Sequence, residues 1–338
     1  MGHEYTMTKT SKVTIKEVAK DAGVSVGTVS RVLAKTAEVK QPLRERVNRS
    51  IIKLKYKPNL AARALRANHV NVIGLMVPDI TNPYFAQVAN LLESEASKKG
   101  YALILASSHG DVNHEARQFS ALLDHSPKGI VLIPTSDTIK MELPKNIRIS
   151  ILDRPLAEMN AIALDQGKSS ALAADHLVEL GHRKIAYIAG PHDIQTSIER
   201  ESGFSNRIAE LQSKNDSIEL TIFRGQFDYT SGEAIARDIL SLVQSQRPTA
   251  IAAASDQQAI GAIRAATDMG VSVPNEVSVI GFDDIVLAEL LVPRLTTIRQ
   301  PVYDMVIEAL DQILGRDDSI CNQRYMGELI VRSTTAAV

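Results

Sequence analysis

The stretch VAKDAGVSVGTVSRVLA, from Val18 to Ala34, decides the fold of the N-terminal part of this chain. Just before it, Thr14 and Glu17 have the spacing of a capping box, in which each side chain accepts a backbone N–H of the other residue. This spacing predicts a helix that starts at residue 15 and runs to about residue 22. Gly23 follows, and glycine readily adopts the positive φ of a sharp turn. The first half of the stretch therefore predicts a helix followed by a tight turn.

A second helix is predicted directly after this turn, from Val26 to about Ala34, with Ser25 as its N-cap. Apolar residues one turn apart predict a third helix from about Leu43 to Leu54. Two helices joined by a short glycine-containing turn form a helix-turn-helix, and a third helix completes a small core. The side chains available to that core are Ile15, Val18, Ala19, Val29, Val32, Leu33, Val47, Ile51 and Leu54.

The exposed face of the second helix predicts contacts with DNA, because the early residues of this helix enter the major groove in helix-turn-helix units. Arg31 has the donors to grip a guanine, and Val26 can touch a thymine methyl. Phosphate contacts, which orient a protein without reading sequence, are expected from Lys16, Lys35, Arg44 and Arg49. The predicted DNA-binding residues of this unit are Thr14, Lys16, Ser25, Val26, Gly27, Thr28, Ser30 and Arg31. A purely structural helical hairpin is the alternative.

Charge is distributed unevenly along the chain, although the formal net charge is only −1. Residues 1–66 hold 15 Lys and Arg against 5 Asp and Glu, whereas residues 67–338 hold 23 against 34. A basic head on an acidic body indicates a polyanionic partner for the head alone. A solvated basic tail is the alternative that charge by itself leaves open, and the helix-turn-helix pattern favours DNA.

The segment after the third helix has the composition of a hinge. Pro58 ends the preceding helix, and Asn59 can cap a new one over residues 60–66, which are strong helix formers. This helix is too short to be stable alone, which suits a hinge that folds only when it is bound. An ordinary alanine-rich linker helix is the alternative.

Composition excludes several classes of protein. The 338 residues are 44% hydrophobic, which is enough for more than one domain. The only cysteine, Cys321, cannot form an internal disulfide, which fits the cytoplasm. No apolar run is long enough to span a membrane, and residues 1–11 are expected to be a disordered lead-in rather than a secretory signal. Nucleotide-binding, hydrolase and metal-ligand motifs are missing, so we expect no enzyme, no cofactor and no metal.

From about residue 70 the pattern changes to alternating strands and helices, which predicts parallel sheets covered on both faces. Two such series, divided near Asp165, indicate two similar subdomains. Ligands bind at the carboxyl ends of the strands in such sheets. Polar side chains follow those strand ends, namely Asp79, Ser107, Asp137, Asp153, Arg154, Asp256 and Asp283. A small ligand rich in hydroxyls or ring nitrogens is expected in a cleft between the two edges.

The sequence closely resembles the LacI/GalR family of bacterial transcription regulators over nearly its whole length. The resemblance is carried by VTIKEVAKDAGVSVGTVSRVL, YKPNLAARALR, IGLMVPDITNPYF, GIVLIPTSD, LDRP, HLVELGHRKIAYIAGP, ERESGF, SDQQAIGAIRAATDMGVSVPNEVSVIGFDD and LTTIRQP. It implies a homodimer with a DNA-binding headpiece, a hinge helix and a core like the periplasmic sugar-binding proteins. The two subdomains of that core are expected to be linked by crossings near Asp165, Leu295 to Arg299 and Tyr325 to Glu328.

The resemblance also implies roles for particular residues. In the hinge, Asn59, Ala62 and Leu65 are expected at the DNA, with Leu65 wedged into the minor groove. The implied effector-binding residues are Asp79, Asn82, Phe85, Ser136, Asp153, Arg154, Arg200 and Asp256. A structural alternative pairs Arg200 with Glu199 or Glu201 and makes Asp256 a helix cap. Lys40 departs from the family pattern, since a serine usually caps the third helix there.

These observations predict an all-α headpiece over residues 12–58, a hinge over 59–69 and an α/β core over 70–338. The core is expected to divide into an N-subdomain of about residues 70–165 and 298–325 and a C-subdomain of about 166–297 and 326–338. The predicted function is sequence-specific regulation of transcription in the cytoplasm, by a repressor that binds a pseudo-palindromic operator. A sugar, sugar acid or nucleoside-like effector is expected to control this binding. A solute-binding protein or a sugar-processing enzyme with the same core fold is the alternative.

Overall fold

The computed structural model describes residues 13–33, 39–54, 56, 71–156, 159–212, 218–315 and 324–338. The chain divides into two compact units, Met1–His69 and Val70–Val338. The expected lead-in, the expected hinge with Asn59, Ala62 and Leu65, and also Ala34, Lys35 and Cys321 lie outside the described residues.

The first unit contains the predicted helix-turn-helix, with α1 over Ile15–Ala22 and α2 over Val26–Leu33. The capping box is present, because Thr14 N–H donates to Glu17 Oε2 at 2.6 Å and Glu17 N–H donates to Thr14 Oγ1 at 3.4 Å. Gly23 has a φ of 60°, the left-handed conformation that the turn requires. Local signals in the sequence therefore set both the start and the end of α1.

The third helix, α3, covers Gln41–Lys53 and begins earlier than predicted. Pro42 stands in its first turn, where its missing N–H costs nothing. Lys40 occupies the N-cap position without a side-chain hydrogen bond, as its departure from the family pattern predicts. The three helices share one small core, whose buried members are Val18, Ala19, Ala22, Val29, Val32, Val39 and Val47.

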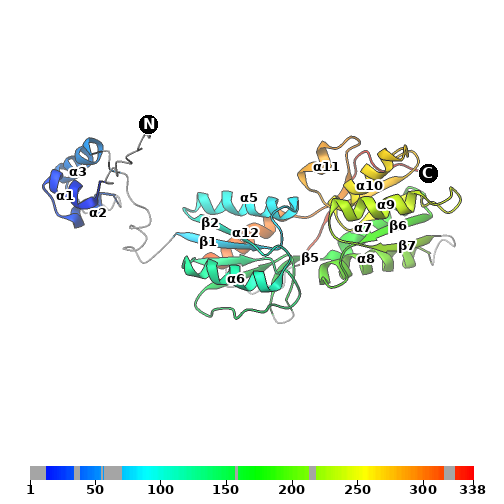
Figure 1. Cartoon of the computed structure of the whole chain (residues 1–338), viewed down its shortest axis with the longest axis horizontal. Coiled ribbons are helices and arrows are strands. Elements are labelled where there is room, and N and C mark those ends of the chain that lie inside the picture. The colour runs from blue at the N-terminus through cyan, green and yellow to red at the C-terminus, as the bar shows by residue number, and fades with distance from the viewer. Residues whose placement is uncertain are drawn as a thin grey trace, which may run out of the picture. The chain divides into compact units, whose positions relative to one another are not determined.

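The second unit contains two six-stranded sheets (Figure 1). The first has the strand order β11-β5-β4-β3-β1-β2, and its strand pairs are parallel. Its strands are β1 (Val72–Val77), β2 (Ala102–Ser107), β3 (Gly129–Leu132), β4 (Arg148–Leu152), β5 (Ala161–Leu164) and β11 (Arg324–Tyr325).

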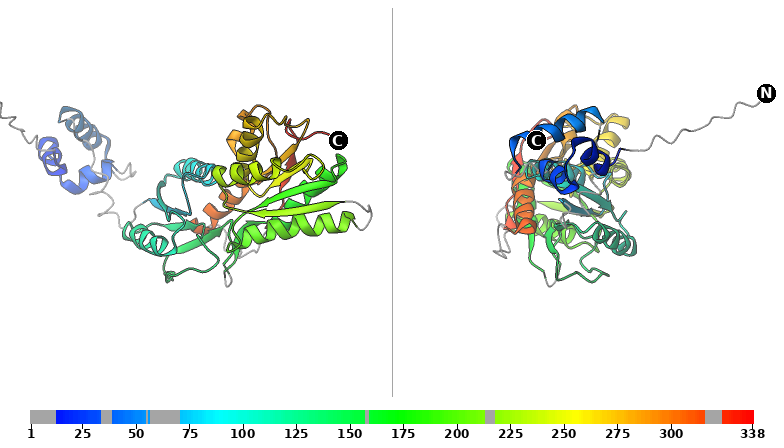
Figure 2. Two further views of the ribbon diagram at one scale, coloured as in Figure 1. Left: turned by 45° about the vertical axis from the view of Figure 1, so that its right-hand side comes forward. Right: turned by 90° about the vertical axis from the view of Figure 1, so that its left-hand side faces the viewer.

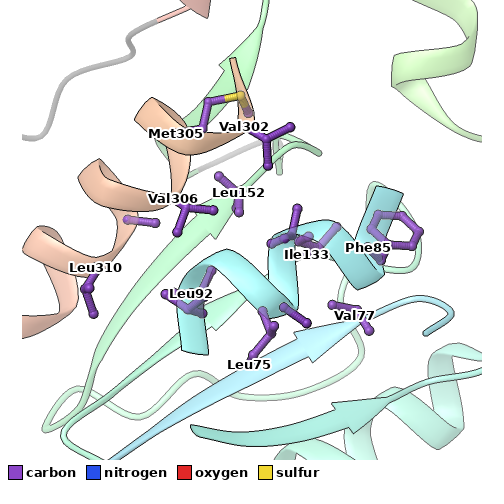
Figure 3. Close-up of a cluster of buried hydrophobic side chains, with 14 of the residues drawn as sticks. Leu75, Val77, Phe85, Leu92, Ile133, Leu152, Val302, Met305, Val306 and Leu310 are labelled. Carbon is purple, nitrogen blue, oxygen red and sulfur yellow. The ribbon is translucent and has the colours of Figure 1, made fainter. Parts of the chain in front are cut away.

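Helices cover both faces of this first sheet. On one face, α5 (Pro83–Lys98) and α12 (Val302–Leu314) pack with Leu75 and Leu152 into the core shown in Figure 3. On the other face, α6 (Val112–Asp124) packs its Phe119 against the sheet. The continuous apolar runs of the strands reflect burial on both sides.

The second sheet has the order β12-β10-β9-β8-β6-β7. Its strands are β6 (Lys184–Ala189), β7 (Glu219–Arg224), β8 (Ala250–Ala253), β9 (Ser278–Asp283), β10 (Thr296–Arg299) and β12 (Glu328–Ile330). Helices α7 (Gln166–Glu179) and α8 (Gln195–Gln212) cover one face of this sheet, and α9 (Tyr229–Leu240) and α10 (Asp256–Asp268) cover the other (Figure 2). The short α11 (Val286–Leu290) follows β9.

The prediction of two parallel-sheet subdomains is confirmed, with one exception. Strand β12 runs antiparallel to β10, because it returns along the edge of the sheet after the third crossing. The chain passes between the sheets after β5, after β10 and between β11 and β12. Strand β10 pairs with β9 as far as Arg299, so the second sheet extends past residue 297, where the sequence placed the boundary.

Among the residues that the structure describes, no helix has both the length and the apolar character needed to cross a membrane.

Candidate functional site

The carboxyl ends of strands from both sheets border one cavity in the second unit. This is the position at which ligands bind in open α/β sheets. The first subdomain contributes Asn82, Tyr84, Phe85, Asp153 and Arg154, and the second contributes Thr196, Arg200, Phe227, Ser255 and Asp283. The predicted effector residues Asn82, Phe85, Asp153, Arg154 and Arg200 are thus brought together.

Arg200 lies on α8 and is 5% exposed. Its Nη1 lies 3.2 Å from Asp283 Oδ1 and donates to the Ala254 carbonyl at 2.6 Å. Its Nε donates to Gln166 Oε1 at 2.8 Å, and its guanidinium carbon lies 3.8 Å from the centre of the Phe282 ring. A planar guanidinium fixed in this way presents its donors in one orientation.

The structural alternative for Arg200 is wrong, because the neighbouring glutamates have other partners. Glu199 pairs with Arg324 at 3.1 Å, and Glu201 pairs with Arg224. Arg200 is therefore held by Asp283, Gln166 and the Ala254 carbonyl rather than by the acidic residues beside it in sequence.

A chain of hydrogen bonds links the two sides of the cavity. The Tyr84 hydroxyl donates to Asp153 Oδ1 at 3.1 Å and also lies 3.5 Å from Gln300 Oε1. Gln300 stands at the second crossing, and its amide nitrogen donates to Asp283 Oδ1 at 2.7 Å. Burial raises the pKa of Asp283 to about 6, and the charge of Arg200 opposes this rise.

Both carboxylates of the cavity have unusual backbone conformations. Asp153 has a φ of 66° and Asp283 a φ of 117°. Residues other than glycine rarely adopt a positive φ, and such strained positions cluster at functional sites. The fold therefore holds these two acids in place at a cost in local backbone energy.

Arg154 is the second cation of the cavity. Its Nη1 donates to the carbonyls of Pro134 at 3.2 Å and Thr135 at 3.0 Å, and its guanidinium lies over the Phe85 ring. Its Nε is buried and has no hydrogen-bond acceptor among the described residues, although Asp153 Oδ2 lies 4.0 Å away. Burial lowers the pKa of Arg154, and the charge of Asp153 opposes this.

Three of the predicted effector residues do not border the cavity. Asp79 accepts the backbone N–H of Thr81 at 2.9 Å, and Ser136 donates to the Thr138 carbonyl at 2.7 Å. Asp256 is fully buried and accepts Thr297 Oγ1 at 2.5 Å and the Ile285 N–H at 2.9 Å. Burial and the charge of Asp283 raise the pKa of Asp256 well above its usual range.

Asp256 is also not the N-cap of its helix, since Ser255 holds that position and accepts the Gln258 N–H at 3.2 Å. The carboxylate that faces Arg200 is Asp283, which the sequence places at a strand end but which the resemblance did not select. Sequence reasoning also missed Tyr84, Thr196, Phe227 and Ser255. Tyr84 and Ser255 are next to predicted residues, whereas Thr196 and Phe227 carry no local signal.

In the headpiece, α2 presents the predicted reading face. Lys16, Ser25, Gly27, Ser30 and Arg31 are exposed. The others are only partly available: Val26 and Thr28 are half-buried, and Thr14 takes part in the capping box. Ser25 Oγ lies 2.9 Å from Thr28 Oγ1 and accepts the Thr28 N–H at 3.2 Å, so these two side chains also fix the start of α2.

Of the expected phosphate contacts, Lys16 and Arg49 are exposed, whereas Arg44 is half-buried. Arg46, which was not predicted, donates to the Ala22 carbonyl at 2.7 Å, in the last turn of α1. Groups of three or more His, Cys, Asp or Glu side chains that could hold a metal ion do not occur in the described part of the chain.

Comparison with known proteins agrees with both units. Residues 14–59 match the model for bacterial regulatory proteins of the lacI family, and residues 174–335 match that for a periplasmic binding protein-like domain. The Ribose operon repressor of Halalkalibacterium halodurans is 34% identical over 329 residues, which cover 95% of this chain and 97% of that protein. The transcriptional repressor PurR of Erwinia tasmaniensis is 35% identical, over 90% of each chain.

Among solved structures, the Lac repressor dimer bound to operator and the anti-inducer ONPF is similar in fold. Its TM-score is 0.82 at 27% sequence identity, and the match covers 97% of this chain and 100% of the repressor chain. These relatives are transcription regulators rather than enzymes. The chain therefore belongs to the LacI family of bacterial regulatory proteins.

Proposed function

We propose that this protein is a homodimeric repressor that binds operator DNA through its headpiece. A small effector that occupies the cavity of the core changes the affinity for the operator. The protein acts in the cytoplasm, binds the effector without transforming it, and needs no cofactor. Regulation then consists of a coupling free energy between two sites, typically about 1–3 kcal/mol.

The observation that carries this proposal is the make-up of the cavity. Asp153 and Arg154 come from one subdomain, and Arg200 and Asp283 from the other. A ligand bonded to all four would hold the subdomains in one relative arrangement, so its binding free energy would select between conformations.

The same four side chains favour a neutral, polyhydroxylated effector. Two guanidinium groups and two carboxylates balance in formal charge, so a ligand with a net charge would leave the buried site unbalanced. Hydroxyl groups both donate and accept, and so can bond to the carboxylates and the arginines at once. The rings of Phe85 and Phe227 offer apolar surface for the faces of a sugar. One relative is named for a ribose operon, which makes D-ribose the first compound to test.

Thermal unfolding of the full chain tests this proposal with D-ribose, D-galactose, D-gluconate, adenosine and hypoxanthine. A ligand at 100 times its Kd stabilises the folded state by about 2.7 kcal/mol. We expect a neutral sugar to raise the Tm of the wild type and to leave that of R200A unchanged. A rise with gluconate alone would contradict the neutral class, and a rise that persists in R200A would place the effector elsewhere.

A further inference from the structure

A buried glutamate lies behind the cavity without bordering it. Glu115 is in the first turn of α6 and is only 1% exposed. Its Oε1 accepts the backbone N–H of Thr135 at 2.7 Å, and its Oε2 has no hydrogen-bond partner among the described residues. Burial of a carboxylate costs free energy unless hydrogen bonds compensate for the lost water. Packing alone therefore does not explain a buried carboxylate in which one of the two oxygens accepts no hydrogen bond.

The peptide unit that Glu115 holds is also held from its other end. The N–H of Thr135 and the carbonyl of Pro134 belong to one peptide plane, and Arg154 Nη1 donates to that carbonyl at 3.2 Å. The negative end of the peptide dipole therefore faces the guanidinium, and its positive end faces the carboxylate. Hydrogen bonds to ionised groups are stronger than neutral ones, so each charge stabilises the contact of the other.

This arrangement fixes the guanidinium of Arg154. Its Nη1 donates to the carbonyls of both Pro134 and Thr135, and its Nε is buried and has no hydrogen-bond partner among the described residues. The Ser108 hydroxyl also contacts the Thr135 hydroxyl, and so fixes the same loop from a second direction. The position of Arg154 thus depends on the loop, and the position of the loop depends on Glu115.

We propose that Glu115 is a positioning residue for effector binding, which fixes the guanidinium of Arg154 at the cavity through the Pro134–Thr135 peptide. The inference rests on the proposed function, since it assigns Glu115 to the same cavity. The pKa of Glu115 agrees with it: burial raises this pKa, while the backbone hydrogen bond from Thr135 and the charge of Arg154 lower it.

Two substitutions in the full chain separate the charge from the hydrogen bond. Glu115→Gln keeps the shape and one acceptor but removes the charge, and Glu115→Ala removes both. Glu93→Gln, on the exposed face of α5, is the matched control. By isothermal titration with D-ribose, we expect E115Q to lose about tenfold in affinity, E115A to lose more and E93Q to lose nothing.

A double-mutant cycle tests whether the effect passes through Arg154. If it does, E115A causes no further loss of ribose affinity in a chain that already carries R154A. Full and additive losses in the double variant would overturn the proposal, as would wild-type affinity in folded E115A.

The NMR resonance of the Arg154 Nε–H in the ligand-free chain gives a readout that needs no ligand. We expect it to shift and to exchange faster with water in E115Q, and to stay in place in E93Q. An unchanged resonance in E115A would overturn the role of Glu115. If D-ribose fails to bind the wild type while the resonance responds as expected, the proposed effector is wrong and the positioning role stands.

Discussion

The carboxylate of Asp137 accepts the backbone N–H of Gln195, with 3.0 Å between Oδ2 and the nitrogen. Asp137 follows β3 in the first subdomain, and Gln195 is the first residue of α8 in the second. The helix that carries Arg200 therefore has its N-terminal acceptor supplied by the opposite subdomain. A carboxylate at a helix N-terminus is favourable because it bonds an otherwise unpaired N–H and faces the positive end of the helix dipole.

Removal of this contact should weaken effector binding although Asp137 does not border the cavity. Loss of an N-terminal acceptor costs about 1 kcal/mol, so D137A should bind effector about fivefold more weakly. D137N keeps one acceptor and should lose less. Isothermal titration measures both, with D238A on the exposed face of α9 as the control. Equal affinity in D137A and D238A would show that the contact does not contribute.

Substitution of Asp283 should affect the ligand directly. D283N removes the charge that lies 3.2 Å from Arg200 Nη1, and leaves a buried guanidinium without its ionised partner. We expect the effector affinity to fall about tenfold or more, since hydrogen bonds to charged groups are worth about 1.5–3 kcal/mol. Affinity equal to the wild type in a folded D283N would contradict the placement of the site.

Asp256 should act on stability rather than on ligand binding. D256A leaves the buried Thr297 hydroxyl and Ile285 N–H without their acceptor, which should lower the free energy of unfolding by about 1–3 kcal/mol. Urea unfolding without effector measures this loss against D238A. Wild-type stability combined with a lost effector response would restore Asp256 to the binding site.

His182 should make stability depend on pH. It follows α7, is buried and contacts Thr249 Oγ1 at 2.9 Å, and burial lowers its pKa to about 4. Between pH 6.5 and 4 the unfolded chain binds a proton that the folded chain does not, so stability falls as the pH falls. The raised pKa of Asp283 increases stability as the pH falls. This contribution is the same in the wild type and in variants of His182.

H182Q should therefore lose less stability than the wild type between pH 7 and pH 4.5, as measured by the midpoint of urea unfolding at each pH. Parallel losses in the two proteins would mean that His182 does not carry the lowered pKa.

The headpiece could be predicted closely because its determinants are local. Thr14 and Glu17 are three residues apart, and Gly23 adopts the positive φ of the turn directly after the helix. The start of α3 was missed because the prediction relied on apolar spacing, which begins at Leu43. Pro42 is compatible with the first turn of a helix, so α3 begins before it, at Gln41.

The cavity could be predicted only in part. Strand ends identify candidates, but Asp256 and Asp283 both satisfy that rule. Which of the two carboxylates faces Arg200 depends on a tertiary contact, the hydrogen bond that Asp256 accepts from Thr297, and on the positive φ of the Asp283 backbone. Neither leaves a signal at short range in the sequence. The antiparallel β12 is missed for the same reason, since its direction depends on where the third crossing leads.

The central claim is that a ligand in this cavity controls operator binding. Its most direct test uses the full chain and a DNA site selected from a random duplex library, with affinity measured by fluorescence anisotropy at fixed salt. The operator Kd of the wild type and of D283N is measured without effector and at increasing concentrations of D-ribose. We predict that saturating D-ribose changes the operator Kd of the wild type by about fivefold or more, and that D283N needs about tenfold more D-ribose, or more, for the same change. An operator Kd that does not respond in the wild type, or that responds equally in both proteins, would contradict the claim.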